Sequence, residues 1–368
     1  MVEMEKVSIK RTLKGRAVSE NTRHRFETTT SEAIDDGWWQ QEELSDSLPV
    51  KTSLIKEHSK TIISNNQSPD VPFEQSINPY RGCEHGCVYC YARPSHAFWD
   101  LSPGLDFESK IIYKANAIEL LEKKFNSPSY QCKPITIGAN TDAYQPVERK
   151  LKITRQILQL MLDYQHPVSI ITKGQLIGRD LDLLAKLADK NLVSVAVSVT
   201  TLENSLKRIL EPRTASPTSR LEIIRKLSEK NIPVTALIAP IIPAINDGEI
   251  EKMIHQVSLS GATRAAYILL RLPYELKAIF GDWLDTHFPQ RKEKVLNYLR
   301  EMRGGKLNEQ RFGRRMSGDG IYAQLINRRF HVACQKFGIE GLHGREGDIQ
   351  SLNTSLFRSD QPKQFDLL

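Results

Sequence analysis

Between about residue 70 and residue 275, short apolar runs alternate with segments whose apolar residues recur every three or four positions. Five runs are apolar or β-branched almost throughout, as is typical of strands buried on both faces of a sheet. They are PITIGA (134–139), PVSIITKG (167–174), LVSVAVSVT (192–200), PVTALIAP (233–240) and RAAYILLRLP (264–273). We expect a sixth strand, the first in chain order, near Ile77.

The segments between these runs predict amphipathic helices, for example TRQILQLMLD, LDLLAKLADK and RLEIIRKLSEK. A repeated strand–helix alternation predicts parallel strands joined by right-handed crossovers. Six such units are fewer than the eight of a closed barrel. The pattern therefore predicts an α/β fold, either a partial (β/α)6 TIM-type barrel or a doubly wound sheet. In both, functional side chains gather at the carboxyl ends of the strands.

We expect four parts along the chain. Residues 1–70 are polar and read as an N-terminal extension, in which the pair Trp38–Trp39 docks onto the protein's own surface. Residues 71–275 form the α/β core, residues 276–345 form a helical region without strands, and residues 346–368 form a loose tail.

Composition places limits on the class of protein. The mean hydropathy of −0.40 and the lack of an apolar run of about 18 residues predict no membrane span. The first residues lack the apolar stretch of a secretory signal, so we expect a cytoplasmic location.

The net charge of +7 is concentrated in one stretch. Residues 291–331, which we call the basic window, hold eleven Lys or Arg and four acids, and 11 − 4 gives +7. The window predicts either a nucleic-acid partner, with Phe312, Tyr322 and Phe330 available for stacking, or a solvated helical face.

Three of the five cysteines, Cys83, Cys87 and Cys90, fall within eight residues in the pattern C-x3-C-x2-C. Thiolates select zinc, copper(I) or iron–sulfur clusters. A structural zinc site would take His85 as a fourth ligand, although such sites usually add a second, distant pair of ligands. Three cysteines on an iron–sulfur cube instead leave one iron open. We expect the cube, with His85 facing solvent and with Gly82 and Gly86 at positive φ.

The pattern C-x3-C-x-aromatic-C, with Tyr89 before the last cysteine, resembles the signature of the radical S-adenosylmethionine (SAM) superfamily. The strings SPDVPFEQSINPYRGCEHGCVYCYARPSH, SPGLDFESK, GANTDAYQPVERK, RILEPRTASP and IAPIIPAINDGEIE resemble a bacterial subfamily labelled DNA repair photolyase-like for its kinship to spore photoproduct lyase. This resemblance implies a partial (β/α)6 barrel, a [4Fe–4S] cluster on the three cysteines and SAM across the top of the barrel. It also implies a reductant such as flavodoxin or ferredoxin.

The resemblance also suggests residues that bind SAM, one of which is Tyr89. Asn140 and Asp142 follow the second strand, where Asp142 would hold the ammonium group of SAM or, alternatively, would cap its own loop. Lys173 would pair with the SAM carboxylate or else extend to solvent. Ser198 and Thr200 share one face of the fourth strand and would reach SAM if that face points inward.

Two arginines complete the set of candidates. Arg213 in EPR (211–213) would clamp a carboxylate, and Arg271 ends the sixth strand, where substrate contacts are expected. In spore photoproduct lyase a hydrogen-donating cysteine lies on the second-strand loop, where this chain has Asn140, and Cys132 comes too early in the chain. The substrate therefore stays open between nucleic acid, for lyase or repair chemistry, and a peptide or metabolite. The alternative class is an iron–sulfur or zinc protein that serves regulation or electron transfer without SAM.

Overall fold

The computed structural model describes residues 13–28, 50–342 and 351–359. At its centre lies an eight-stranded sheet in the order β11-β10-β9-β8-β7-β6-β3-β2. The strands are β2 (Ile63–Asn65), β3 (Gln75–Ile77), β6 (Ile135–Ile137), β7 (Val168–Thr172), β8 (Val193–Ser198), β9 (Val234–Ile241), β10 (Arg264–Leu269) and β11 (Glu340–Gly341). The series β3, β6, β7, β8, β9, β10 is parallel, and each strand pairs with its predecessor. A doubly wound sheet would reverse its order at a switch point. The sequential order therefore confirms the predicted partial (β/α)6 barrel.

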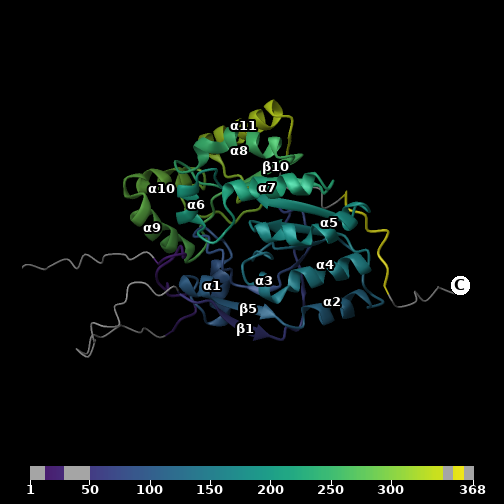
Figure 1. Cartoon of the computed structure of the whole chain (residues 1–368). Helices are drawn as coiled ribbons and strands as arrows, with labels where there is room; N and C mark the ends of the chain where they lie inside the picture. The colour runs from purple at the N-terminus through teal and green to yellow at the C-terminus, as the bar shows by residue number, and fades with distance from the viewer. Residues whose placement is uncertain (1–12, 29–49, 343–350, 360–368) are drawn as a thin grey trace, which may run out of the picture.

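Helices follow the strands along the outer side of the sheet (Figure 1). They are α2 (Ala117–Phe125), α3 (Glu148–Leu151), α4 (Ile153–Asp163), α5 (Leu181–Ala188), α6 (Asn204–Leu210), α7 (Pro217–Ser228) and α8 (Ile250–Leu259), with the short 3-10 turns η3 (Gln175–Asp180) and η4 (Asp247–Glu249). The helical periodicity decides which side of each helix is buried. In α4, for example, Ile157, Leu158 and Met161 are fully buried against the sheet.

A helical region follows β10, as predicted. It consists of α9 (Leu276–His287), η5 (Pro289–Arg291), α10 (Lys292–Glu301) and α11 (Gly320–Lys336). It is not free of strands, because β11 pairs with the start of β10. Cys334 on α11 is buried, at 2% exposure. No helix within the described residues is both long and apolar enough to cross a bilayer.

The N-terminal part of the chain packs against the core. β1 (Ser53–Glu57), β5 (Lys110–Lys114) and β4 (Tyr80–Arg81) form a second sheet in the order β1-β5-β4. Residues 13–28 lie against the segment that contains η2 (Arg93–Trp99) and α1 (Leu105–Ser109), where Leu105 N donates to Glu20 O. Trp38 and Trp39 lie outside the described residues.

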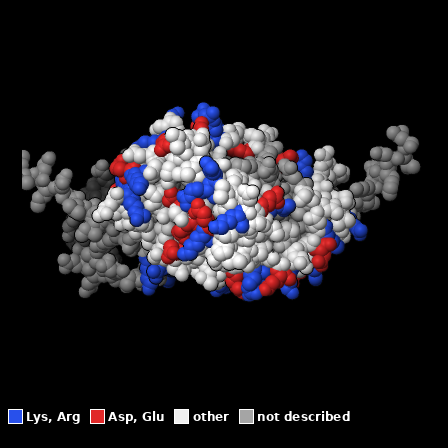
Figure 2. All heavy atoms as spheres, turned by 90° about the horizontal axis from the view of Figure 1, so that it is seen from above, with Lys and Arg blue, Asp and Glu red and all other residues white. Residues whose placement is uncertain are grey.

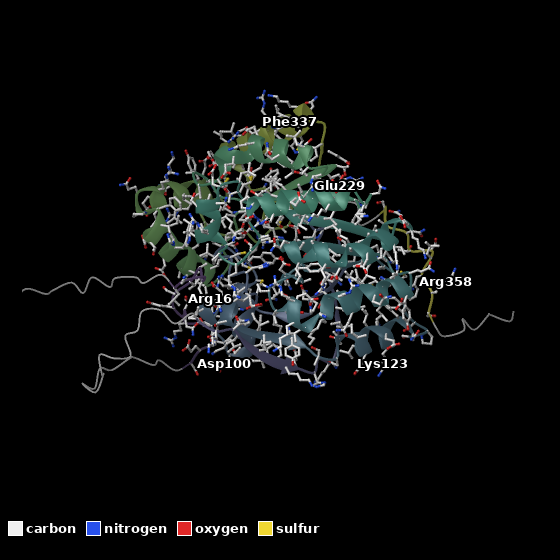
Figure 3. All side chains as sticks on the ribbon, viewed as in Figure 1. Arg16, Asp100, Lys123, Glu229, Phe337 and Arg358 are labelled. Carbon is white, nitrogen blue, oxygen red and sulfur yellow. The ribbon has the colours of Figure 1, made fainter. Side chains whose placement is uncertain are left out.

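The C-terminal segment 351–359 docks onto the barrel, which differs from the loose tail we expected. The Phe357 ring packs edge-on against Phe125, and the Arg358 amide donates to Tyr164 O. Figure 3 shows Arg358 and Lys123 of α2 on the same side of the molecule. One aromatic ring that fills a gap between helices is enough to anchor a polar segment, and polarity alone did not indicate this.

More than half of the basic side chains in the basic window are paired with acids. Six of its eleven basic side chains form ion pairs, with Asp285, Glu293, Glu309, Asp319, Asp70 and Glu251 as partners. In Figure 2, Lys and Arg lie among Asp and Glu on the face seen from above. The proposal that Phe330 stacks on a base is wrong, because its ring is 0% exposed and packs against Tyr267.

Candidate functional site

The three clustered cysteines lie in the loop between β4 and η2 and line one cavity of about 200 Å³. The cavity opens at the carboxyl ends of the parallel strands. Gly82 and Gly86 have φ of +75° and +65°, as predicted. A Cβ on Gly86 would lie 2.6 Å from Glu108 Oε2, so the loop can pass this carboxylate only as glycine.

Arg93 holds this loop in shape. Its guanidinium is fully buried and donates to the carbonyls of Gly86, Cys87, Pro103 and Gly104. The remaining charge is balanced by Glu108, which is also fully buried. Because these bonds go to backbone carbonyls, they fix the loop without using the thiols.

The three thiols are buried, and two of them lie next to carboxylates. Burial raises the pKa of Cys83, Cys87 and Cys90, and the neighbouring Asp142 and Glu211 carboxylates add to the rise at Cys83 and Cys87, respectively. These surroundings keep the thiols protonated, and a bound metal group would stabilise the thiolate forms. Within the described residues, no three His, Cys, Asp or Glu side chains gather around a single metal ion. The three thiols instead share the wall of a larger cavity, and this donor set fits an iron–sulfur cube.

His85 does not face solvent as expected. It is 3% exposed, and its Nδ1 lies 3.2 Å from Asp142 Oδ2. Asp142 also accepts hydrogen bonds from the Thr172 hydroxyl and the Lys173 amide, both at 2.7 Å. Burial opposes ionisation of this carboxyl, but His85 and the hydrogen bonds outweigh it and lower the pKa of Asp142 to about 2. Asp142 thus joins the cysteine loop to the ends of β6 and β7.

Other predicted residues also lie around the cavity. Its wall includes Tyr89, Asn140, Asp142, Lys173, Ser198 and Arg271. Lys173 extends from the end of β7, and its Nζ lies 6.0 Å from the centre of the Tyr89 ring. Within the described residues Lys173 forms no ion pair and interacts with the Glu211 carboxylate only at longer range, so its ammonium group can contact an anion in the cavity.

Residues 77–257 match the radical SAM superfamily. This segment is a radical SAM domain. An uncharacterised protein of Mycobacterium bovis is 34% identical over 222 residues, which cover 60% of this chain and 65% of the relative. An uncharacterised protein of Methanocaldococcus jannaschii is 29% identical, with coverage of 67% and 88%. This chain thus spans slightly less than two thirds of the length of the mycobacterial relative.

The radical SAM domain resembles solved structures of one enzyme in its fold. Spore photoproduct lyase complexed with dinucleoside spore photoproduct aligns with a TM-score of 0.57 at 16% identity, over 78% of this chain and 81% of that chain. A variant of the same enzyme with AdoMet and the dinucleoside bound gives the same score. At this identity the likeness concerns the fold. The radical SAM family uses a [4Fe–4S] cluster and SAM.

Sequence reasoning missed the carboxylate that organises the other side of the radical SAM site. Glu211 is fully buried and accepts hydrogen bonds from Tyr89 Oη and from Arg220 Nη2 at 2.5 Å, and its Oε2 lies 3.9 Å from Cys87 Sγ. Burial disfavours its charged form, but Arg220, Lys173 and Tyr89 outweigh this and hold the pKa of Glu211 below its ordinary value. Glu211 is the first residue of the EPR string (211–213). The sequence pattern drew attention to the arginine of this string, as a carboxylate clamp, and not to its glutamate.

Two predicted SAM contacts lie behind the cavity wall. Thr200 Oγ1 donates to Ala239 O and lies 3.2 Å from Tyr89 Oη, so it supports Tyr89 from below. Arg213 does clamp a carboxylate, but that carboxylate is Glu84 of the cysteine loop, at 3.0 Å. Contact of either residue with SAM stays a prediction.

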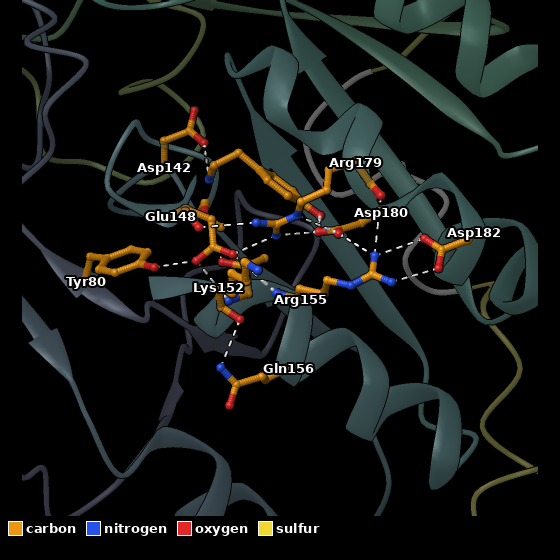
Figure 4. A network of polar contacts seen from close by, with 12 residues as sticks. Tyr80, Asp142, Glu148, Lys152, Arg155, Gln156, Arg179, Asp180 and Asp182 are labelled. Atoms are coloured by element: carbon orange, nitrogen blue, oxygen red, sulfur yellow. Dashed lines mark hydrogen bonds and ion pairs between the residues drawn. The ribbon is translucent and has the colours of Figure 1, made fainter. Parts of the chain in front are cut away.

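The GANTDAYQPVERK string folds into a buried polar network below the site (Figure 4). Glu148 accepts hydrogen bonds from Tyr80 Oη, from the Thr154 amide and from Arg179. Arg179 also pairs with Asp180 at 2.8 Å. The network ties β4, which leads into the cysteine loop, to the helices that follow β6 and β7, so this string serves the architecture of the radical SAM domain.

Proposed function

We propose that the chain is a radical SAM enzyme that holds a [4Fe–4S] cluster on Cys83, Cys87 and Cys90 and binds SAM in the adjoining cavity. The observation that supports this is the convergence of three thiols and one available lysine in a cavity at the strand ends. When bound, the cluster supplies the electron that splits SAM into methionine and a 5′-deoxyadenosyl radical, which removes a hydrogen atom from the substrate.

In this proposal the chain's own residues bind and orient SAM and exclude water from the cavity. Lys173 pairs with the SAM carboxylate, and Asn140 and Asp142 lie where the ammonium group would bind. Ser198 offers a hydroxyl to the ribose. Apolar side chains such as Ile171, Leu237 and Leu269 line the rest of the cavity and exclude water and stray hydrogen donors from the reaction.

We propose nucleic acid as the substrate class and flavodoxin or ferredoxin as the reductant. The fold is shared with an enzyme that was solved with a dinucleoside spore photoproduct bound. This chain has Asn140 where that enzyme is expected to carry a hydrogen-donating cysteine, so reversal of the same lesion is not part of the proposal.

The test is anaerobic reconstitution of the full chain with iron and sulfide, followed by reduction with dithionite in the presence of SAM. We expect about four irons per chain and release of 5′-deoxyadenosine. Lys173→Met should weaken SAM binding and slow this release, while Lys186→Met at an exposed helix position should not. A chain that retains zinc and never cleaves SAM would instead support the regulatory alternative.

A further inference from the structure

Large aromatic side chains are exposed in an unusual setting. In the described part of the chain, six aromatic residues have exposed side chains: Phe26, Tyr91, Phe98, Trp99, Tyr274 and Phe312. Each of the six rings has an arginine guanidinium within 6 Å of its centre. We call this set of rings and their arginines the aromatic–arginine belt. Exposed aromatic rings that gather on one surface often mark an interaction site.

The belt begins at the cavity that the three cysteines line. Tyr91 and Arg271 form part of the cavity wall, and the Arg271 guanidinium lies 5.9 Å from the Tyr91 ring centre. On one side lies Arg315. Burial lowers the pKa of Arg271, and the nearby positive charge of Arg315 lowers it further. The Arg315 guanidinium in turn lies 4.7 Å from the centre of the Phe312 ring. The belt therefore continues from the cavity wall onto the outer surface.

A second group of belt rings surrounds Arg25, and one of them, Tyr274, lies in the turn after the sixth strand, three positions beyond Arg271. Arg25 lies 4.6 Å from the Phe26 ring, 5.2 Å from Phe98 and 4.5 Å from Tyr274. Glu275 holds this arginine in place through both carboxylate oxygens. The rings are thus presented on a fixed support, and Phe98 remains 71% exposed.

Arg271 differs from the other belt arginines in its pairing. Arg25, Arg81 and Arg315 each pair with a carboxylate, whereas among the described residues Arg271 has only Met316 Sδ at 3.7 Å, and its buried Nε has no partner. Asp70 acts on Arg271 only at longer range, because its carboxylate is paired with Arg315. A desolvated guanidinium that forms no ion pair of its own favours a bound anion. It stands at the boundary between the cavity and the outer surface.

We propose that the aromatic–arginine belt binds single-stranded nucleic acid, with unpaired bases on its rings and a phosphate on Arg271. This inference rests on the proposed function and names the partner of the same site. Aromatic faces beside guanidinium groups match a strand in which flat bases alternate with phosphates, and bases in a duplex cannot reach such rings. Only Phe312 and Arg315 of the basic window belong to this surface. Six of the eleven basic side chains in the window are paired with acids, and its Phe330 is buried.

The test is fluorescence anisotropy with the reconstituted full chain and labelled strands of about 12 nucleotides. DNA and RNA strands of the same sequence distinguish the two sources, and the matching duplex serves as a competitor. We expect the single strand to bind at least tenfold more tightly than the duplex. Phe98→Ala or Tyr274→Ala should weaken binding about tenfold, and Arg271→Ala should reduce the salt slope by about 0.7.

Arg328→Ala is the matched control, since this exposed arginine belongs to the basic window and lies outside the belt. Equal binding of duplex, an equal loss in the control, or strong binding of an acidic ferredoxin that depends on Phe98 would overturn the inference. If the chain cleaves SAM but binds no single strand, only the inference about the aromatic–arginine belt is wrong. A chain that binds the strand through these residues but never cleaves SAM contradicts the proposed function alone.

Discussion

The guanidinium of Arg93 lies against the carboxylate of Glu108, and both side chains are completely excluded from solvent. Arg93 is also the residue that gathers four backbone carbonyls around the cysteine loop. The Arg93–Glu108 pair thus stabilises the fold and also fixes the shape of the cysteine loop.

Arg93→Ala should lower the free energy of unfolding by about 3–5 kcal/mol, because it leaves the buried Glu108 charge and several carbonyls without partners. Arg93→Lys should recover only part of this, since an ammonium group cannot reproduce the planar set of donors. Guanidinium chloride titration monitored by circular dichroism measures the free energy of unfolding of both variants. Arg225→Ala, which breaks exposed ion pairs on α7, should lower the free energy of unfolding far less, because water screens these charges. If Arg93→Ala and Arg225→Ala lowered the free energy of unfolding by similar amounts, Arg93 would not have the stabilising role described above.

Replacement of Cys83, Cys87 or Cys90 by alanine should each abolish the iron–sulfur cluster, because no fourth cysteine lines the cavity. Iron and sulfide analysis after anaerobic reconstitution measures the loss. Cys334→Ala should keep a full cluster, since this thiol is buried on α11. Full iron content in any of the three variants would exclude the assigned ligand set.

Glu211→Gln should raise the midpoint potential of the cluster. The carboxylate oxygen lies 3.9 Å from Cys87 Sγ, and a negative charge there disfavours the reduced, more negative form. Loss of the charge also leaves Arg220 uncompensated, which acts in the same direction. A dye-mediated titration followed by electron paramagnetic resonance gives the potential. Glu222→Gln on the exposed side of α7 is the control, and a lowered potential in Glu211→Gln would refute the argument.

Stability should fall as the pH is lowered from about 6.5. Burial lowers the pKa of His166 to about 3, while Tyr130 and the Pro167 carbonyl satisfy its ring nitrogens. The unfolded chain takes up a proton below its ordinary pKa of about 6.5 and the folded chain does not, so this group alone removes about 1.4 kcal/mol per pH unit.

His166→Phe keeps the stack on Phe125 and removes the titration. Denaturant titrations from pH 7 to pH 4 should therefore show a smaller pH slope in this variant, although His96, whose pKa burial lowers to about 4, retains its own share. His58→Gln at an exposed position should leave the slope unchanged. An unaltered slope in His166→Phe would show that His166 does not contribute.

The strands and the cysteine loop were predictable because each depends on a local pattern. A run such as 192–200 is apolar enough to require burial on both faces, and Gly82 and Gly86 mark positive φ beside the thiols. The partners of the charged side chains were not predictable in this way. Tyr89 and Glu211 are 122 positions apart in sequence, and only the order of the strands brings them together.

His85 illustrates why burial in a loop is hard to predict. A histidine among glycines and a cysteine has the composition of an exposed turn, and its burial depends on Asp142, which comes from the end of a different strand. Phe357 is a similar case, because its docking depends on a gap between Phe125 and Tyr164 that no local pattern describes.

The hydrogen bonds from Arg93 to the backbone have a consequence for a protein that is exposed to oxygen. Oxygen strips iron from exposed clusters, and a loop that owed its shape to the metal would collapse when that happened. Here the polypeptide keeps its contour through bonds that involve no sulfur. If the chain loses its cluster, we therefore expect the loop to keep its shape, so that iron and sulfide alone would restore the site.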